Sequence, residues 1–194
     1  MRTRIAAAAL AAAAALSLTA CSSDSRPVKT TPDGAPTTST GAAAPAKSSA
    51  KPAASAVAGV GDTVTIAGST DVELAITLKK WLPSAKSGDE FFTPDKGKMW
   101  VAGQFQIKNV GTTAYSDSPG NCVQAADAKG QRFDYFYVDS ITAGPQLPST
   151  VDLTPGDTVL GWMVFEVPKG TTVTRVQYTP DSGFGEQTGQ WSTT

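Results

Sequence analysis

The sequence predicts an all-β protein built as an antiparallel sandwich of two sheets, preceded by a signal peptide and a disordered tether. Three observations predict this organisation. From about residue 59 onward, apolar and polar side chains alternate with a period of two, which is typical of half-buried strands. Residues that favour tight turns separate the alternating runs. No window longer than one turn carries a helical stripe, so a doubly wound architecture is not expected.

The N-terminus carries a short export signal. Arg2 and Arg4 precede an Ala- and Leu-rich run, residues 5–18, which is shorter than the about 20 residues that span a membrane. The run ends in Leu18-Thr19-Ala20-Cys21, which resembles the lipobox of bacterial lipoproteins. That resemblance implies that residues 1–20 are cleaved off and that Cys21 carries a diacylglycerol. The alternatives are an ordinary secretory signal cut near Ala20 and a short uncleaved anchor.

A lipid on Cys21 determines the expected location. One acyl chain binds a membrane only marginally, whereas two chains give stable anchoring. We therefore expect the mature protein on the outer face of the bacterial cytoplasmic membrane, held there through its lipid and without a transmembrane helix.

Residues 21–58 have the composition of a tether. After Cys21 they are mostly Ala, Pro, Ser, Thr and Gly, with scattered charges and no aromatic residue, Leu or Ile. Such a segment cannot bury enough apolar surface to offset the entropy of ordering its backbone. As a flexible coil it would hold the next domain roughly 35 Å from the membrane. A stalk with O-glycans on Thr37–Thr40 is the alternative to a bare spacer.

Residues 59–194 have the length of one domain. They carry fifteen acidic and ten basic residues, so no basic patch for nucleic acid is expected. Alternation predicts seven strands: Thr63–Ala67, Val72–Lys79, Val101–Lys108, Cys122–Ala126, Arg132–Tyr137, Val159–Val167 and Thr172–Tyr178. Turns are predicted at Asn109–Gly111, Pro119–Asn121, Asp127–Gly130, Pro155–Asp157 and Pro168–Gly170.

The order of these motifs adds a resemblance. The strand ending in Asn109-Val110-Gly111 is followed by Asp127-Ala128-Lys129-Gly130, by Leu153-Thr154-Pro155-Gly156, and by the strand Gly161–Pro168. From about Gly61 to Tyr178, the chain resembles the telokin-like, immunoglobulin-like extracellular domain of many Gram-positive lipoproteins. The resemblance implies a surface-exposed immunoglobulin-like sandwich. That family has no established catalytic residues, so none is carried over.

Missing residue types exclude much chemistry. The chain contains no histidine, which rules out Ser-His-Asp triads, Cys-His pairs and His-ligated metal sites within one chain. Once Cys21 is lipidated, Cys122 has no partner for an intramolecular disulfide. We expect Cys122 to be a small buried apolar residue, and the alternative is a reactive thiol.

Two clusters of acidic residues leave hydrolysis and metal binding open. They are Asp127, Asp134 and Asp139, and Asp89, Glu90 and Asp95. Either group could serve carboxylate-pair hydrolysis or weak calcium binding, but solvated acidic loops are commoner and neither follows the spacing of a dedicated calcium loop. We therefore predict no catalytic residue, no metal site and no cofactor.

The sequence predicts a non-enzymatic module that binds a protein or cell-envelope partner, with a small-ligand or calcium-binding lipoprotein as the alternative. The candidate contact residues are Tyr135, Phe136 and Tyr137, since a strand sends neighbouring side chains to opposite faces and one aromatic face exceeds what a two-layer sandwich needs. The alternative is that another part of the chain covers these rings, either residues 82–97 or the tail around Phe184 and Trp191.

The lipoprotein hypothesis predicts the effect of Cys21→Ala. The variant lacks the sulfur that would carry the lipid, so it should appear in the medium or accumulate as uncleaved precursor. Fractionation with immunoblotting measures both. A variant that is still processed and membrane-bound would contradict the hypothesis.

Overall fold

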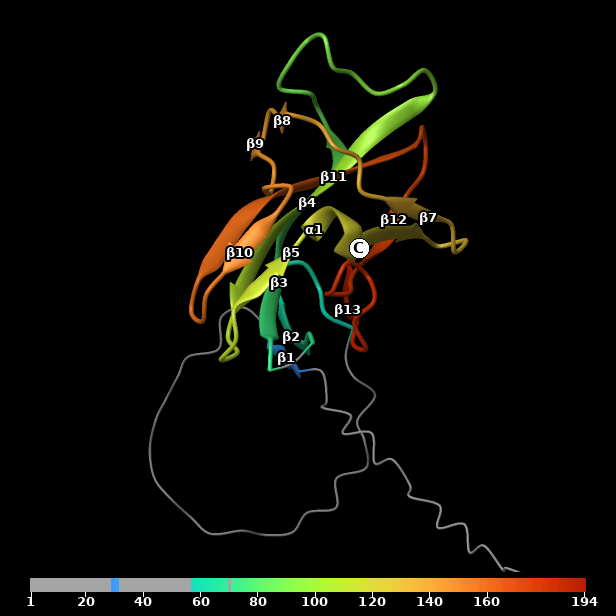
Figure 1. Cartoon of the computed structure of the whole chain (residues 1–194). Coiled ribbons are helices and arrows are strands. Elements are labelled where there is room, and N and C mark those ends of the chain that lie inside the picture. The colour runs from blue at the N-terminus through green and yellow to red at the C-terminus, as the bar shows by residue number, and fades with distance from the viewer. Residues whose placement is uncertain (1–28, 32–56, 70) are drawn as a thin grey trace, which may run out of the picture.

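The computed structural model describes residues 29–31, 57–69 and 71–194. Their strands form two main antiparallel sheets (Figure 1). The five-stranded sheet has the order β1 (Lys29–Thr31), β2 (Thr63–Ala67), β3 (Glu73–Ala85), β4 (Lys98–Asn109) and β11 (Thr158–Pro168). The four-stranded sheet has the order β13 (Gly189–Ser192), β12 (Val173–Tyr178), β6 (Val123–Asp127) and β7 (Arg132–Asp134). The predicted all-β, immunoglobulin-like sandwich is confirmed.

Short elements complete the domain. β5 (Tyr115–Asp117) pairs with β10 (Val151–Leu153), and β8 (Ser140–Ile141) pairs with β9 (Gly144–Pro145). The predicted turn at Pro119 is instead a single helical turn, α1 (Pro119–Cys122), with proline in its first turn, where its missing N–H costs nothing. Among the described residues, no helix is long and apolar enough to cross a membrane.

The space between the two sheets is filled by what we call the inner core. The five-stranded sheet supplies the residues that alternate inward along β2, β3, β4 and β11, and the four-stranded sheet supplies those of β6, β12 and β13. The rings of Phe105 and Trp191 meet edge to face across this space, with centroids 6.0 Å apart. The buried Trp191 indole N–H donates to Asp62 O at 3.0 Å, which satisfies its one polar atom.

The end of the five-stranded sheet near the β3–β4 loop is also buried on its other face. There a second set of side chains packs together, which we call the outer cluster: Ala85, Trp100, Ala102, Val138, Ile141, Trp162 and Val164, with Leu82 and Phe136 partly buried against them. Residues 136–141 cross this face, where Ile141 bridges to Ser87. Because β4 is covered on both faces here, residues 98–102 do not follow the polar alternation of a surface strand.

Asn109 joins two of the predicted turns. Its fully buried side chain donates from Nδ2 to Thr113 O at 2.8 Å and to Leu153 O at 2.9 Å, and its Oδ1 accepts from Gly111 N at 3.0 Å. A Cβ on Gly111 would lie 2.6 Å from Asp71 O, so the backbones approach too closely for any other residue. The Asn-x-Gly motif therefore ties the end of β4 to the end of β10.

All seven predicted strands are present, but several boundaries differ, and the short strands β1, β5, β8, β9, β10 and β13 were not predicted. β2 spans the predicted residues, β3 continues to Ala85, and the predicted strand Arg132–Tyr137 ends at Asp134. β1 lies inside the segment predicted as a tether and pairs antiparallel with β2. Of that segment, residues 57–58 are also described, with Ala58 buried and bridged to Trp191. Cys21 and the other residues of the segment lie outside the described residues, and the predicted domain boundaries stay predictions.

Removing the Asn109 side chain should destabilise the fold. Asn109→Ala leaves two carbonyls and one N–H without their partner, so the free energy of unfolding should fall by about 3 kcal/mol. Urea unfolding measures the change. Asn121→Ala is the control, because Asn121 is exposed, and its effect should stay within about 0.5 kcal/mol. Equal effects of the two substitutions would contradict the role given to Asn109.

Candidate functional site

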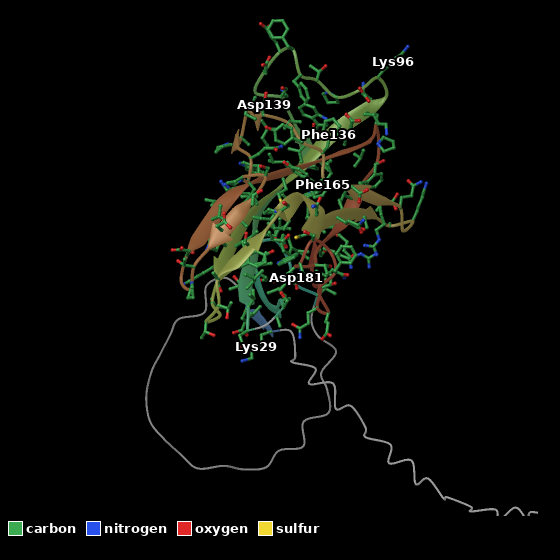
Figure 2. All side chains as sticks on the ribbon, viewed as in Figure 1. Lys29, Lys96, Phe136, Asp139, Phe165 and Asp181 are labelled. Atoms are coloured by element: carbon green, nitrogen blue, oxygen red, sulfur yellow. The ribbon has the colours of Figure 1, made fainter. Side chains whose placement is uncertain are left out.

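The predicted aromatic run lies where the chain crosses from one sheet to the other. β7 pairs with β6 up to Asp134, after which Tyr135 bridges to Phe165 of β11. Phe136 N then donates to Val164 O at 2.8 Å. The chain therefore leaves the four-stranded sheet and covers part of the free edge of the five-stranded one. Figure 2 shows Phe136 and Phe165 in this upper part of the domain.

Tyr135 faces the inner core. Its ring is half-buried over Gly120, where an added Cβ would lie 2.6 Å from the ring. Its hydroxyl donates to Gln146 Oε1 at 2.6 Å. Burial, with a smaller effect of Tyr137, raises the pKa of Tyr135 to about 12. Tyr135 therefore holds the crossover in place and offers only part of its ring to solvent.

Phe136 points to the opposite face, into the outer cluster. Its ring centroid lies 6.0 Å from that of Trp100, and Phe92 lies 6.2 Å from the same indole. Trp100 is fully buried, and its Nε1 donates to Glu166 Oε1 at 3.2 Å. A row of three tilted aromatic rings, Phe92, Trp100 and Phe136, therefore links the β3–β4 loop to the crossover.

Tyr137 is the exposed member of the predicted run. It is 58% exposed, and its hydroxyl donates to Asp139 Oδ1 at 3.2 Å; this bond to the carboxylate raises the tyrosine pKa. Phe91 is 90% exposed and Phe92 is 46% exposed on the neighbouring β3–β4 loop. We call Phe91, Phe92 and Tyr137 the aromatic end.

The loop that carries Phe91 is held on both sides. Gly88 N donates to Ser140 O at 3.1 Å, and Asp95 N donates to Glu166 Oε1 at 3.2 Å. Phe91 N donates to Asp89 Oδ1 at 2.8 Å, which fixes the turn before the exposed ring. Phe91 is thus presented to solvent from a loop with defined backbone bonds.

The aromatic end lies far from the point where the predicted tether meets the domain. In Figure 1 the β3–β4 loop projects at the opposite end from β1 and β2. Lys96 and Asp139 accordingly lie at one end of the domain in Figure 2, and Lys29 lies at the other. Of the predicted contact residues, the structure places only Tyr137 mainly in solvent, and it adds Phe91 and Phe92. The sequence signal for them is the adjacent Phe91-Phe92 pair in residues 82–97, a connection that was predicted to cover the aromatic run or to supply carboxylates, and not to bind a partner.

Cys122 belongs to a buried polar group around Asp117. Asp117 Oδ2 accepts from Tyr115 OH at 2.8 Å, from Cys122 Sγ at 3.1 Å and from Ser182 N at 2.9 Å. Tyr178 OH lies 3.3 Å from Tyr115 OH. Burial, the bond to Asp117 and the nearby carboxylate charge raise the pKa of Cys122 to about 12. The thiol is therefore protonated and unreactive, as expected of a structural cysteine.

The charge of Asp117 is stabilised by its donors. Burial alone would raise its pKa, but hydrogen bonds from Ser182, Cys122 and Tyr115 outweigh burial and lower the pKa to about 2. Ser182 and Asp181 both have positive φ, 54° and 58°, so this contact holds a strained turn beside α1. The group links β5, α1 and the turn after β12, and it has the character of a structural clamp.

The candidate carboxylates accept hydrogen bonds from residues nearby in the chain. Asp127 Oδ1 accepts from Lys129 N and Gln131 N, both at 2.9 Å, which closes the predicted Asp-x-x-Gly hairpin. Asp134 Oδ1 accepts from Gln124 Nε2 at 2.8 Å. Within residues 57–69 and 71–194, no three carboxylate or cysteine side chains gather closely enough to hold a metal ion.

The Asp117 group predicts a specific pH dependence. Its pKa lies below the unfolded value near 3.8, so its contribution to stability is present above about pH 4 and is lost as pH falls toward 2. Asp117→Asn should therefore be less stable than the wild type at pH 6, and the gap should narrow between pH 4 and 2. Urea midpoints across that range measure it, and parallel curves for the two proteins would contradict the clamp.

Comparisons with known proteins found several similar structures and one matching family. The structure is similar to the secreted protein MPT63 of Mycobacterium tuberculosis, with 16% identity, a TM-score of 0.49, and coverage of 71% of this chain and 96% of that one. It is also similar to YcdA of Bacillus subtilis, a candidate lipoprotein, with 17% identity, a TM-score of 0.44, and coverage of 63% and 36%.

A third similar structure is an uncharacterised β-sandwich protein of Clostridium difficile, with 13% identity, a TM-score of 0.38, and coverage of 78% of this chain and 100% of that one. No curated protein matches the chain. The family model described as domain of unknown function DUF4352 matches residues 58–189, which is most of the sandwich. The chain belongs to the DUF4352 family.

Proposed function

We propose that this protein is a lipid-anchored, extracellular binding module of the bacterial cell envelope, without catalytic activity. The anchor is Cys21, and the bound partner is a protein or another envelope component. The proposal rests on the Leu18-Thr19-Ala20-Cys21 motif for the location and on the aromatic end for the binding.

The observation that carries the binding proposal is the exposure of Phe91 and Tyr137 on an ordered support. A phenylalanine that is 90% exposed gains nothing from folding, because its ring stays in water. The loop nevertheless is held by defined hydrogen bonds of its backbone, and the tilted rings of Phe92, Trp100 and Phe136 pack against one another beneath it. Exposed aromatic side chains on a pre-organised surface are typical of binding sites.

The charges beside Phe91 favour one kind of partner. The exposed carboxylates of Asp89, Glu90 and Asp95 on the loop, with Asp139 beside Tyr137, outnumber the exposed Lys86 and Lys96 of the same loop. A partner with an apolar pocket and a basic rim would complement this surface. An anionic lipid surface would repel these carboxylates, so a membrane is the less favoured occupant.

The position of the aromatic end agrees with such a role. It lies at the opposite end of the domain from β1, the first described segment after the predicted anchor (Figure 1). A protein anchored at Cys21 would therefore present Phe91 away from the membrane to which it is attached.

Substitutions at the aromatic end test the proposal. Phe91→Ser combined with Tyr137→Ser should reduce capture of an envelope partner by the immobilised chain at least tenfold, since exposed aromatic anchors carry most of the energy in interfaces of this kind. Quantitative pull-down from envelope extract measures the loss.

Phe184→Ser is the matched control, because Phe184 is 89% exposed and lies outside the aromatic end. It should leave capture unchanged, and all variants should keep the wild-type melting temperature. Equal capture by the double variant and the wild type would refute the aromatic end as the binding surface.

A further inference from the structure

An open groove lies at one mouth of the sandwich, separate from the aromatic end. It has a volume of about 500 Å³ and lies between the inner face of the five-stranded sheet and the start of β12. Trp81 of β3, Met99 and Val101 of β4, and Val173 of β12 form its apolar floor. Thr171 and Thr172 lie on its rim. The volume falls within the range of small-molecule sites.

A β-bulge places Trp81 in this groove. Along β3, Leu74, Ile76 and Leu78 face the inner core, so simple alternation would continue with Lys80. The pairing with β4 shifts between Leu78 and Lys80, and one extra residue is inserted there. Trp81 therefore takes the inward position. Bulges that redirect a side chain are common beside functional sites.

Within the described part of the chain, the indole N–H of Trp81 has no acceptor. The other three tryptophans donate to Glu166 Oε1, Ala143 O and Asp62 O. No described residue accepts from Trp81 Nε1, and the buried side-chain atoms that lack a partner are Gln146 Nε2 and Arg175 Nε. Among the four tryptophans, Trp81 is thus the one whose N–H has no acceptor within the described part of the chain, and it is the one that lines the groove.

The lining restricts the chemistry of a ligand. None of the described residues that line the groove has a charged side chain, so a charged ligand would find no side-chain counter-charge there. An acyl chain would cover the Trp81 N–H and the Thr171 and Thr172 hydroxyls without offering them a hydrogen bond, which is costly. The favoured ligand is neutral, has an apolar face that packs on an indole, and carries several hydroxyl groups.

We propose that this groove binds a neutral sugar ring, with Trp81 as the platform and the Trp81 N–H and the hydroxyl groups of Thr171 and Thr172 as hydrogen-bonding partners. The C–H face of a sugar supplies the apolar contact, and its hydroxyls satisfy the indole and the threonines. The sugar is either a free saccharide or a unit of a polysaccharide. This site does not depend on the aromatic end or on the lipid anchor.

NMR titration of the full chain tests the site. The probes are three neutral disaccharides, cellobiose, maltose and N,N′-diacetylchitobiose, with glucuronate and 1-octanol as a charged and an apolar comparison. At least one disaccharide should shift the Trp81 indole N–H resonance to saturation. Trp81→Phe and Thr172→Val should each weaken that binding, by about tenfold for loss of the indole donor. Co-sedimentation with cellulose or chitin then distinguishes a polymer from a free saccharide, and either source supports the site.

Two controls show whether a loss of saccharide binding comes from the groove, and not from unfolding or from the aromatic end. Thr172 is exposed, so Thr172→Val keeps the fold even if Trp81→Phe does not. Phe91→Ser should leave saccharide binding unchanged, which distinguishes the groove from the aromatic end. The inference is overturned if no disaccharide gives a saturable shift, if only 1-octanol or glucuronate does, or if both groove substitutions leave the affinity unchanged.

Discussion

The pairing of β4 with β11 is the constraint on which the rest of the structure depends. The two strands pair without a break from Lys98 with Pro168 to Lys108 with Thr158, and β11 forms the edge of the larger sheet that residues 135–136 partly cover. Their inward side chains fill the inner core against the second sheet. Near the β3–β4 loop their outward side chains, Trp100 and Trp162 among them, form the outer cluster. The aromatic end has a rigid support because this sheet is buried on both faces.

The sequence predicted the sandwich well because most strands keep one face polar. β2, β6, β11 and β12 lie close to their predicted ranges, and the Asn109 and Asp127 turns form the hydrogen bonds that their side chains favour. Prediction was weakest where tertiary contacts override local pattern. Trp100 and Ala102 occupy outward positions that alternation assigns to polar residues, because residues 136–141 cover them. Very short strands such as β8 and β9 leave no periodic signal.

The candidate binding residues show the same limit, which is that local pattern does not reveal tertiary contacts. Alternation predicted that Tyr135 and Phe136 point to opposite faces, but not that the chain would change sheets directly before them, after Asp134. Tyr135 packs over Gly120, and Phe136 packs against Trp100. Both partners lie far away along the chain, so the sequence around residues 135–137 carries no sign of them. What remains exposed after this packing is Tyr137, joined by phenylalanines from a loop 45 residues earlier in the chain.

The bulge at Lys79 determines which side chains face each of the two proposed surfaces, the groove and the aromatic end. Beyond it, Trp81 faces inward to the groove while Leu82 packs outward on the outer cluster beneath the aromatic end. On β4 the neighbouring residues divide in the same way, Met99 toward the groove and Trp100 toward Phe92 and Phe136. The groove and the aromatic support therefore lie back to back across the same end of one sheet. Without the extra residue, Lys80 would face the groove and Trp81 the outer cluster, so a single insertion sets the chemistry of both surfaces.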